Sequence, residues 1–162
     1  MTTYVDSSAL VPVYVPERFS NVAREVLGRL PQVPYTPLHE LEVPNAFALL
    51  KGRGLITSDE HHEIRRQLLE DVDAQRLLPV ALDWPDVFAI ACELSEAHTA
   101  KLLTRSLDLP HVAAARATSC RVFVSADDRQ LAAAKAAGLR VIDIKRRPRS
   151  PGAKPTRATR RR

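Results

Sequence analysis

The sequence predicts an α/β fold in which helices cover both faces of a central, mainly parallel sheet. Short apolar segments typical of strands alternate with longer segments typical of helices, and strands separated by helices need crossover connections. The expected strands are apolar on both faces, as is usual when helices cover both sides of a sheet. With 162 residues and a hydrophobic fraction of 45%, the chain is long enough for one domain with a substantial core.

The first half of the chain shows two strand patterns and three helix patterns. The expected strands are residues 2–6 and 32–36, and the expected helices are residues 16–30, 37–54 and 57–76. The first helix is expected to open at Pro16 and to bury one face of apolar side chains. Gly52 and Gly54 close the second helix. Thr57 or Ser58 caps the third, whose first turn carries acids that suit a helix start.

The second half continues the alternation. The expected strands are residues 77–82, 121–125 and 140–144, and the expected helices are residues 84–100, 107–119 and 127–138. Pro85 occupies a favoured first helical position, and Gly138 ends the last helix. We expect Trp84 to anchor packing. The sequence contains no internal repeat.

Charge divides the chain into an acidic body and a basic tail. Residues 145–162 hold nine of the 24 basic residues and none of the 19 acidic ones, so the remainder carries a formal net charge of −4. The tail also contains Pro and Gly and has no hydrophobic period, which predicts a flexible segment. We therefore divide the chain into a folded domain, residues 1–144, and a tail, residues 145–162. The tail either holds RNA phosphates, contacts an acidic partner or only adds solubility.

Neither a membrane span nor a metal-binding cysteine pattern is expected. No run of about eighteen apolar residues occurs, and the N-terminus lacks the pattern of a signal peptide. Cys92 and Cys120 have no metal-ligand spacing, and we interpret both as buried thiols in the reducing cytoplasm.

Acidic residues follow the strands at positions where a site would lie. The segments "TTYVDSSAL" and "RVFVSADDRQL" place Asp6 and Asp127 directly after apolar strands. In open α/β sheets, ligands bind at the carboxyl ends of the strands. Glu42 and Asn45 lie three residues apart and share a helix face. Asp108 stands at the start of an Ala-rich helix, where an ordinary helix cap is the alternative interpretation.

Four carboxylates in one cleft suggest a bound divalent cation. Together they would repel one another and raise their pKa values, and a cation removes that cost. Mg²⁺ prefers oxygen ligands, and two metal ions can support phosphodiester cleavage. Ser8, Asn45 and Ser125 have the hydroxyl and amide groups that support such ligands. The alternative is four unrelated surface acids and caps.

The chain resembles the PIN-domain ribonucleases, and within them the VapC-type toxins of toxin–antitoxin pairs. Four segments in the family's order carry the resemblance, namely "YVDSSALVPVYVPE", "TPLHELEVPNAF", "HTAKLLTRSLDLPHVAAA" and "VFVSADDRQLAAAKAAGLRV". It implies a three-layer α/β/α sandwich around a parallel sheet. It also implies that the metal-binding and catalytic acids are Asp6, Glu42, Asp108 and Asp127, supported by Ser8, Asn45, Arg105 and Ser125.

Some residues depart from the family pattern or keep two interpretations. Pro44 follows Glu42 inside an expected helix, so the helix either starts near Val43 or kinks there. Asp128 is a second candidate for the last acid, although the spacing from Ser125 favours Asp127. His111 either lies near the site or only packs. Arg105 either contacts a substrate phosphate or pairs with an acid.

These observations lead to a functional hypothesis and two rivals. The resemblance implies a cytoplasmic, Mg²⁺- or Mn²⁺-dependent endoribonuclease that forms a homodimer and is inhibited by an antitoxin. One rival is a PIN-like scaffold that binds RNA or a partner without cleaving, which the presence of all four acids disfavours. The other is a phosphate-accepting receiver domain. Lys145 is in roughly the right place for the lysine of a receiver domain. The phosphate-accepting aspartate that such a domain needs after its third strand is matched only by Asp83.

Overall fold

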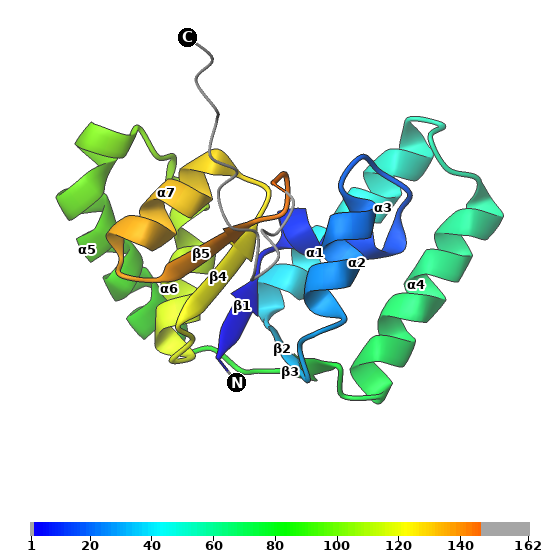
Figure 1. The fold of residues 1–162 in the computed structure, drawn as a ribbon, viewed down its shortest axis with the longest axis horizontal. Helices are drawn as coiled ribbons and strands as arrows, with labels where there is room; N and C mark the ends of the chain where they lie inside the picture. The colour runs from blue at the N-terminus through cyan, green and yellow to red at the C-terminus, as the bar shows by residue number, and fades with distance from the viewer. Residues whose placement is uncertain (1, 147–162) are drawn as a thin grey trace, which may run out of the picture.

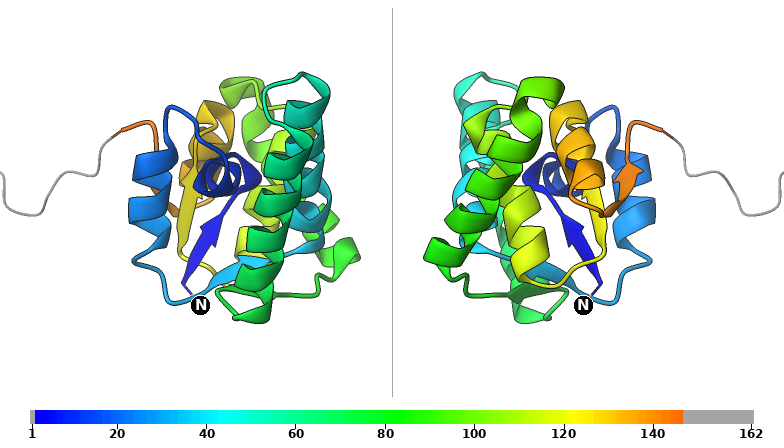
Figure 2. Two further views of the ribbon diagram at one scale, coloured as in Figure 1. Left: turned by 90° about the vertical axis from the view of Figure 1, so that its right-hand side faces the viewer. Right: turned by 90° about the vertical axis from the view of Figure 1, so that its left-hand side faces the viewer.

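In a computed structural model, which describes residues 2–146, the chain forms a three-layer α/β/α sandwich (Figures 1 and 2). The strands are β1 (Thr3–Val5), β2 (Val33–Tyr35), β3 (Leu77–Pro79), β4 (Val122–Ser125) and β5 (Arg140–Asp143). The helices are α1 (Ser7–Tyr14), α2 (Ser20–Leu27), α3 (Pro37–Gly52), α4 (Ser58–Asp73), α5 (Trp84–Leu102), the 3₁₀ turn η1 (Ser106–Asp108), α6 (Leu109–Ala117) and α7 (Asp128–Ala136). The predicted fold class is therefore confirmed.

The strands of the central layer are all parallel and fall into two hydrogen-bonded parts. Within residues 2–146, one part has the order β1-β4-β5 and the other pairs β2 with β3. In the first part, Tyr4 lies opposite Phe123, and Phe123 lies opposite Val141. Strand β2 lies next to β1 (Figure 1) but belongs to the other ladder. The chain therefore needs another way to join β1 to β2.

Side chains supply the joint between β1 and β2. His39, buried in the first turn of α3, accepts a hydrogen bond at Nδ1 from the Thr36 backbone N–H at 3.0 Å. Its Nε2–H therefore donates to the Val5 carbonyl at 2.8 Å. The Tyr4 hydroxyl lies 3.3 Å from Thr36 Oγ1. Burial and the neighbouring His111 lower the pKa of His39 to about 3, so the joint is made by a neutral ring.

Alternation along the strands sends side chains into two cores, one on each side of the sheet. Val5, Val124 and Ile142 pack with α1, α2, α3 and α4. Tyr4, Phe123 and Val141 pack with α5, α6 and α7. This period-two pattern explains why the expected strands had no polar face. Trp84 packs against the second core as predicted.

The largest correction concerns the segment after β1. The sequence predicted no helix before Pro16, but α1 begins at Ser7, directly after the strand. Pro12 lies inside this short helix, and the β-branched residues around it hid the helical pattern. The helix expected from Pro16 to Leu30 extends only over Ser20–Leu27. Before it, Ser20 Oγ donates to the Val15 carbonyl and accepts from the Glu17 N–H, which fixes a non-helical link.

Smaller corrections concern α3, the α5–α6 link and a cysteine. Helix α3 begins at Pro37 and contains Pro44 in its interior, so it does not start near Val43 as one alternative held. The expected helix over residues 107–119 divides into η1 and α6. Both cysteines are free thiols, but Cys92 is exposed and only Cys120 is buried. Gly138 ends α7 with a φ of 82°, as predicted. No helix in the described part of the chain is both long and apolar enough to cross a membrane.

The tail begins with two residues that the structure describes. Lys145 Nζ lies 2.5 Å from Asp128 Oδ1, and Arg146 pairs with Asp143 at 3.3 Å. The rest of the predicted tail, residues 147–162, lies outside the described residues.

We predict that His39→Leu lowers the free energy of unfolding by about 2–5 kcal/mol, because it leaves the buried Val5 carbonyl and Thr36 N–H without partners. Urea unfolding followed by circular dichroism measures the change. His62→Leu, the same substitution at an exposed position, is the control and is expected to stay within about 0.5 kcal/mol of the parent. Equal effects of the two substitutions would contradict the proposed joint.

Candidate functional site

The Asp6 carboxylate lies at the carboxyl ends of β1 and β4, fully buried in a cluster of hydroxyl groups. Ser8 Oγ lies 2.8 and 2.9 Å from its two oxygens, and Ser125 Oγ donates to Oδ2 at 2.8 Å. The Ala9 N–H donates to Oδ1 at 3.1 Å, which makes Asp6 the N-cap of α1. The strand ends thus bring together Asp6, Ser8 and Ser125, three of the predicted site residues.

Electrostatics at Asp6 are set mainly by the loss of solvent. Burial raises the pKa of its carboxyl to about 6, although the nearby His111 and the two serine hydroxyls act to lower it. Protein hydrogen bonds therefore do not fully replace water around the charged form. A cation beside this carboxylate would favour the charged form in the same way as any opposite charge.

Glu42 projects from α3 and pairs with a histidine from α6. Its Oε2 lies 2.7 Å from His111 Nε2, while His111 Nδ1 lies 2.8 Å from the Tyr4 hydroxyl. Burial alone would raise the pKa of Glu42, but the hydrogen bond and charge of His111 outweigh it and hold the pKa below its ordinary value. His111 is thus a buried neighbour of a predicted site residue.

Glu42 faces a pocket of about 400 Å³ beside the Asp6 cluster. The pocket is also lined by Ser7, Ser8 and Glu17. Neither Ser7 nor Glu17 was among the site residues that the sequence predicted. The adjacency of Ser7 to Asp6 was the available signal, whereas Glu17 reaches the pocket through a loop whose path the sequence did not show.

The two remaining predicted acids accept backbone hydrogen bonds beside helix starts, and Asp127 caps α7. Asp127 Oδ1 accepts hydrogen bonds from the Arg129 and Gln130 N–H groups, and its own N–H donates to Ser125 Oγ at 2.8 Å. Asp108 Oδ2 accepts from the Arg105 N–H at 2.7 Å. Asp127 is therefore tied through Ser125 to the Asp6 cluster. Asp108 occupies the N-cap position of α6, but its side chain makes no capping hydrogen bond to that helix and bonds back to η1 instead.

The second candidate for the last acid and two of the supporting residues can also be placed. Asp128 is exposed and pairs with Lys145. Asn45 and Arg105 are exposed, and within residues 2–146 neither side chain forms an ion pair or joins the Asp6 cluster. Contact of Arg105 with a substrate phosphate thus stays a prediction.

The fit to a divalent cation rests on the chemistry of Asp6 and Glu42. A buried carboxylate with a raised pKa and a partly exposed carboxylate at a pocket are oxygen ligands of the kind that Mg²⁺ and Mn²⁺ bind. Within residues 2–146, no three of the Asp, Glu, His and Cys side chains are gathered closely enough to form a metal site as they stand. The four-carboxylate site therefore stays a prediction.

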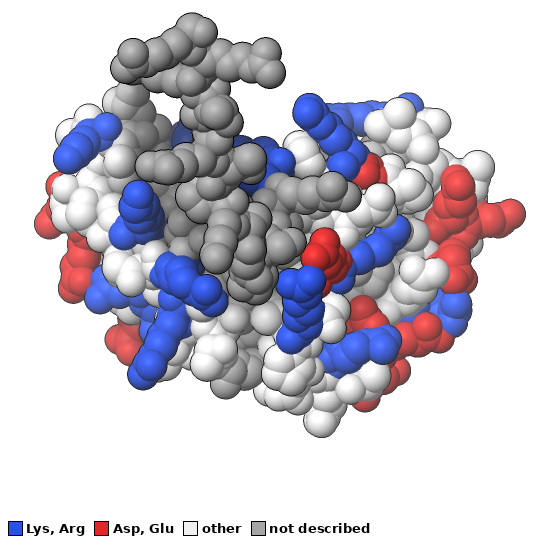
Figure 3. Space-filling view, in the orientation of Figure 1, with Lys and Arg blue, Asp and Glu red and all other residues white. Residues whose placement is uncertain are grey.

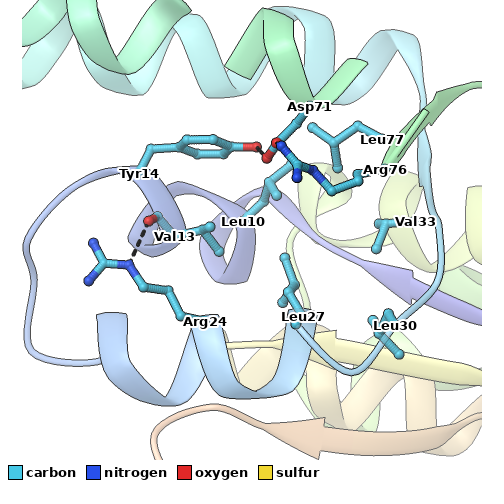
Figure 4. Close-up of a pocket in the computed structure, with 11 residues that line it drawn as sticks. Leu10, Val13, Tyr14, Arg24, Leu27, Leu30, Val33, Asp71, Arg76 and Leu77 are labelled. Carbon is cyan, nitrogen blue, oxygen red and sulfur yellow. Dashed lines mark hydrogen bonds and ion pairs between the residues drawn. The ribbon is translucent and has the colours of Figure 1, made fainter. Parts of the chain in front are cut away.

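A separate hollow of about 230 Å³ lies between α1, α2 and α4 (Figure 4). It is largely apolar, and two hydrogen bonds frame it: Tyr14 Oη donates to Asp71, and Arg24 Nε donates to the Val13 carbonyl. The predicted acids do not line it. This hollow is distinct from the candidate site.

Comparison with known proteins defines the class of the fold and site. The sequence matches the PIN domain family over residues 3–136, and the chain belongs to that family. PIN domains are generally nucleases and usually use divalent metal ions such as Mg²⁺.

Among solved structures, the chain is similar to FitAcB from Neisseria gonorrhoeae, with a TM-score of 0.64 and 16% sequence identity. The match covers 89% of this chain and 99% of the FitAcB chain. At this identity the likeness supports the fold. Comparison with curated proteins finds no match.

We predict that Asp6→Asn changes the pH dependence of stability. The pKa of Asp6 in the folded protein, about 6, exceeds the ordinary 3.8, so the folded protein binds this proton more tightly than the unfolded chain. The proton therefore contributes to stability at low pH, and this contribution is lost as pH rises through 6. From pH 4 to pH 7 the unfolding free energy of the parent is expected to fall relative to Asp6→Asn by up to about 3 kcal/mol. Denaturant unfolding with a chelator present measures this difference.

Asp59→Asn, at an exposed position on α4, is the matched control and is expected to track the parent at every pH. A parent and an Asp6→Asn variant whose stabilities keep a constant difference from pH 4 to pH 7 would contradict the raised pKa of Asp6.

Proposed function

We propose that this protein is a metal-dependent endoribonuclease, the VapC-type toxin of a toxin–antitoxin pair. The observation that carries the proposal is the buried Asp6 carboxylate, held by Ser8 and Ser125 beside the Glu42 pocket in a chain of the PIN family. RNA is the proposed substrate and the cytoplasm the proposed compartment. The motif resemblance described above supports the toxin assignment.

The proposed metal ligands are Asp6, Glu42, Asp108 and Asp127. When bound, Mg²⁺ or Mn²⁺ lowers the pKa of water and stabilises the charge that develops on the phosphodiester. Ser8 and Ser125 hold Asp6 in place by hydrogen bonds to its two oxygens. His111 fixes Glu42 at the edge of the pocket. The exposed Arg105 is available to neutralise a phosphate of the RNA.

The rival proposal of a scaffold that binds RNA without cleaving it makes a different prediction. A scaffold needs Asp6 only as the N-cap of α1, whereas a metal-dependent nuclease also needs its charge as a ligand. The burial of Asp6 beside the Glu42 pocket therefore supports the nuclease. A cleavage assay with and without added metal separates the two.

Exposed leucines near the candidate acids support a homodimer. Leu41 precedes Glu42 and is 72% exposed, while Leu103 and Leu107 flank Arg105 and are 77% and 80% exposed. Large apolar side chains exposed to this degree are typical of an interaction surface when they lie together, as Leu103 and Leu107 do in the link between α5 and α6. We propose that a second subunit covers these leucines and that the antitoxin blocks the neighbouring acidic pocket.

We predict that Asp6→Asn abolishes metal-dependent RNA cleavage, with a loss of at least about 100-fold, because it removes a ligand charge but little volume. Cleavage of a labelled RNA with Mg²⁺ or Mn²⁺ measures activity, and the metal-induced rise in melting temperature reports binding without activity. Asp59→Asn is expected to retain both. Asp6→Asn that cleaves at the parent rate in the presence of metal would refute the assignment.

A second prediction concerns the dimer. Leu107→Asp is expected to convert a dimer to a monomer in sedimentation equilibrium, because a charge at the centre of an apolar interface is left without water or a partner. Leu69→Asp on α4, where the side chain is 58% exposed, is the matched control and is expected to leave the dimer intact. A parent protein that sediments as a monomer would overturn the dimer proposal.

The third prediction concerns the tail. Truncation after Arg146 removes seven basic residues and is expected to weaken RNA binding and to flatten its log–log salt slope by about 0.7 per lost phosphate contact. Binding is measured in the Asp6→Asn background to prevent cleavage. A tail of the same length with these seven residues replaced by glutamine should behave like the truncation. Equal affinity and slope for all three proteins would exclude an RNA-binding tail.

A further inference from the structure

Strand β5 leaves one edge of the sheet open. Within residues 2–146, β5 pairs with β4 alone. The Arg140 N–H donates to the Arg121 carbonyl, and the Ile144 N–H donates to the Ser125 carbonyl, so these groups point toward β4. Alternate residues of a strand direct their N–H and C=O groups to opposite sides, so those of Val141 and Asp143 point to the open edge. An open edge is a template for another strand.

A groove of about 530 Å³ runs beside this edge, between β5 and α2. Figure 2 shows β5 and α2 together at one side of the molecule. Val26 and Leu30 line the groove from the α2 side, and Val141 and Ile142 line it from β5. Its floor is therefore aliphatic, and it offers burial for apolar side chains of a bound segment.

The rim of the groove is basic. Arg29, Arg140 and Arg146 line it, and Asp143 is the only acid among the described residues of the lining. Asp143 accepts a hydrogen bond from the Lys145 N–H and pairs with Arg146. Figure 3 faces this side of the molecule and shows Lys and Arg side chains to the left and right of its centre, with acidic side chains among them on the right. The charge of the groove thus favours a negatively charged occupant.

Three other occupants fit these features less well. The chain's own segment 147–162 carries seven basic and no acidic residues, so it would place like charges together. A second copy of the chain would bring the same arginines against one another. RNA would match the charge, but the lining contains no aromatic ring on which a base could stack, and RNA cannot continue a β ladder.

We propose that the β5 edge and this groove bind an extended, acidic segment of a partner protein, which joins the sheet as a strand beside β5. Its backbone would pair with the outward N–H and C=O groups of Val141 and with the outward N–H of Asp143, whose carbonyl already accepts the Arg146 N–H. Its apolar side chains would enter the groove, and its acidic side chains would meet Arg29, Arg140 and Arg146. This inference does not depend on nuclease activity.

The test uses the full-length protein and a fluorescein-labelled ten-residue peptide of alternating Val and Glu. Fluorescence anisotropy is expected to show binding below about 1 mM, and the amide NMR signals of Val141 and Asp143 are expected to shift. The double variant Arg29→Glu/Arg140→Glu should weaken binding at least tenfold. Arg53→Glu/Arg65→Glu, which changes two exposed arginines outside the groove, should leave it unchanged.

Two further variants test the backbone pairing. Val141→Pro removes an outward N–H and keeps the bonds to β4, so it should abolish binding, while Val141→Ala should retain it. A peptide methylated on alternate backbone nitrogens should also fail to bind, which gives the same answer without altering the protein.

The proposal is overturned if the peptide does not bind at about 1 mM, or if an alternating Val and Lys peptide binds equally well. It is also overturned if Arg29→Glu/Arg140→Glu weakens binding of a single-stranded RNA dodecamer and leaves peptide binding unchanged, because the groove would then be an RNA site.

Discussion

The hydrogen bond from His39 to the Val5 carbonyl holds together the two parts of the central layer, and the candidate site depends on it. The bonded carbonyl belongs to the residue directly before Asp6, so the ring positions the end of β1. Thr36 and the Tyr4 hydroxyl continue the network, and Tyr4 reaches His111, which in turn contacts Glu42. A buried polar network of this kind stabilises a single arrangement only when every member has a partner. The relative positions of Asp6 and Glu42 therefore follow from the joint between β1 and β2.

Stability and function oppose each other at Asp6. A fully buried carboxylate without a cation favours its protonated form at mildly acidic pH, and its ionisation at neutral pH lowers stability. Ser8 and Ser125 reduce this cost and also connect the ends of β1 and β4. Such a destabilised group is retained most readily where a ligand needs its charge. The same two hydroxyl groups thus contribute to both the fold and the candidate site.

The layered fold could be predicted because its signals are local, whereas contacts between distant elements could not. The apolar strands and Gly138 mark their elements within a few residues of sequence. Helix α1 escaped prediction because Pro12 and its β-branched neighbours are poor helix formers, and packing against the sheet stabilises it regardless. The pairing of His111 with Glu42 joins residues 69 positions apart. The spacing of residues along the sequence does not predict such a contact. For the same reason it did not predict that β1 and β2 belong to separate hydrogen-bonded ladders.

Acidic and basic groups lie on different sides of the sheet. The carboxyl ends of β1 and β4 gather acidic and hydroxyl groups, while the open side of β5 gathers arginines and unpaired backbone groups. In the proposed nuclease, a phosphodiester would have to approach an acidic pocket, and a divalent cation would neutralise the carboxylates there. An acidic partner on the β5 edge would not compete for that cation, because it meets arginines on another side of the sheet. The proposed inhibition at the pocket and the proposed binding at the edge are therefore separable, and substitutions at one surface would leave the other intact.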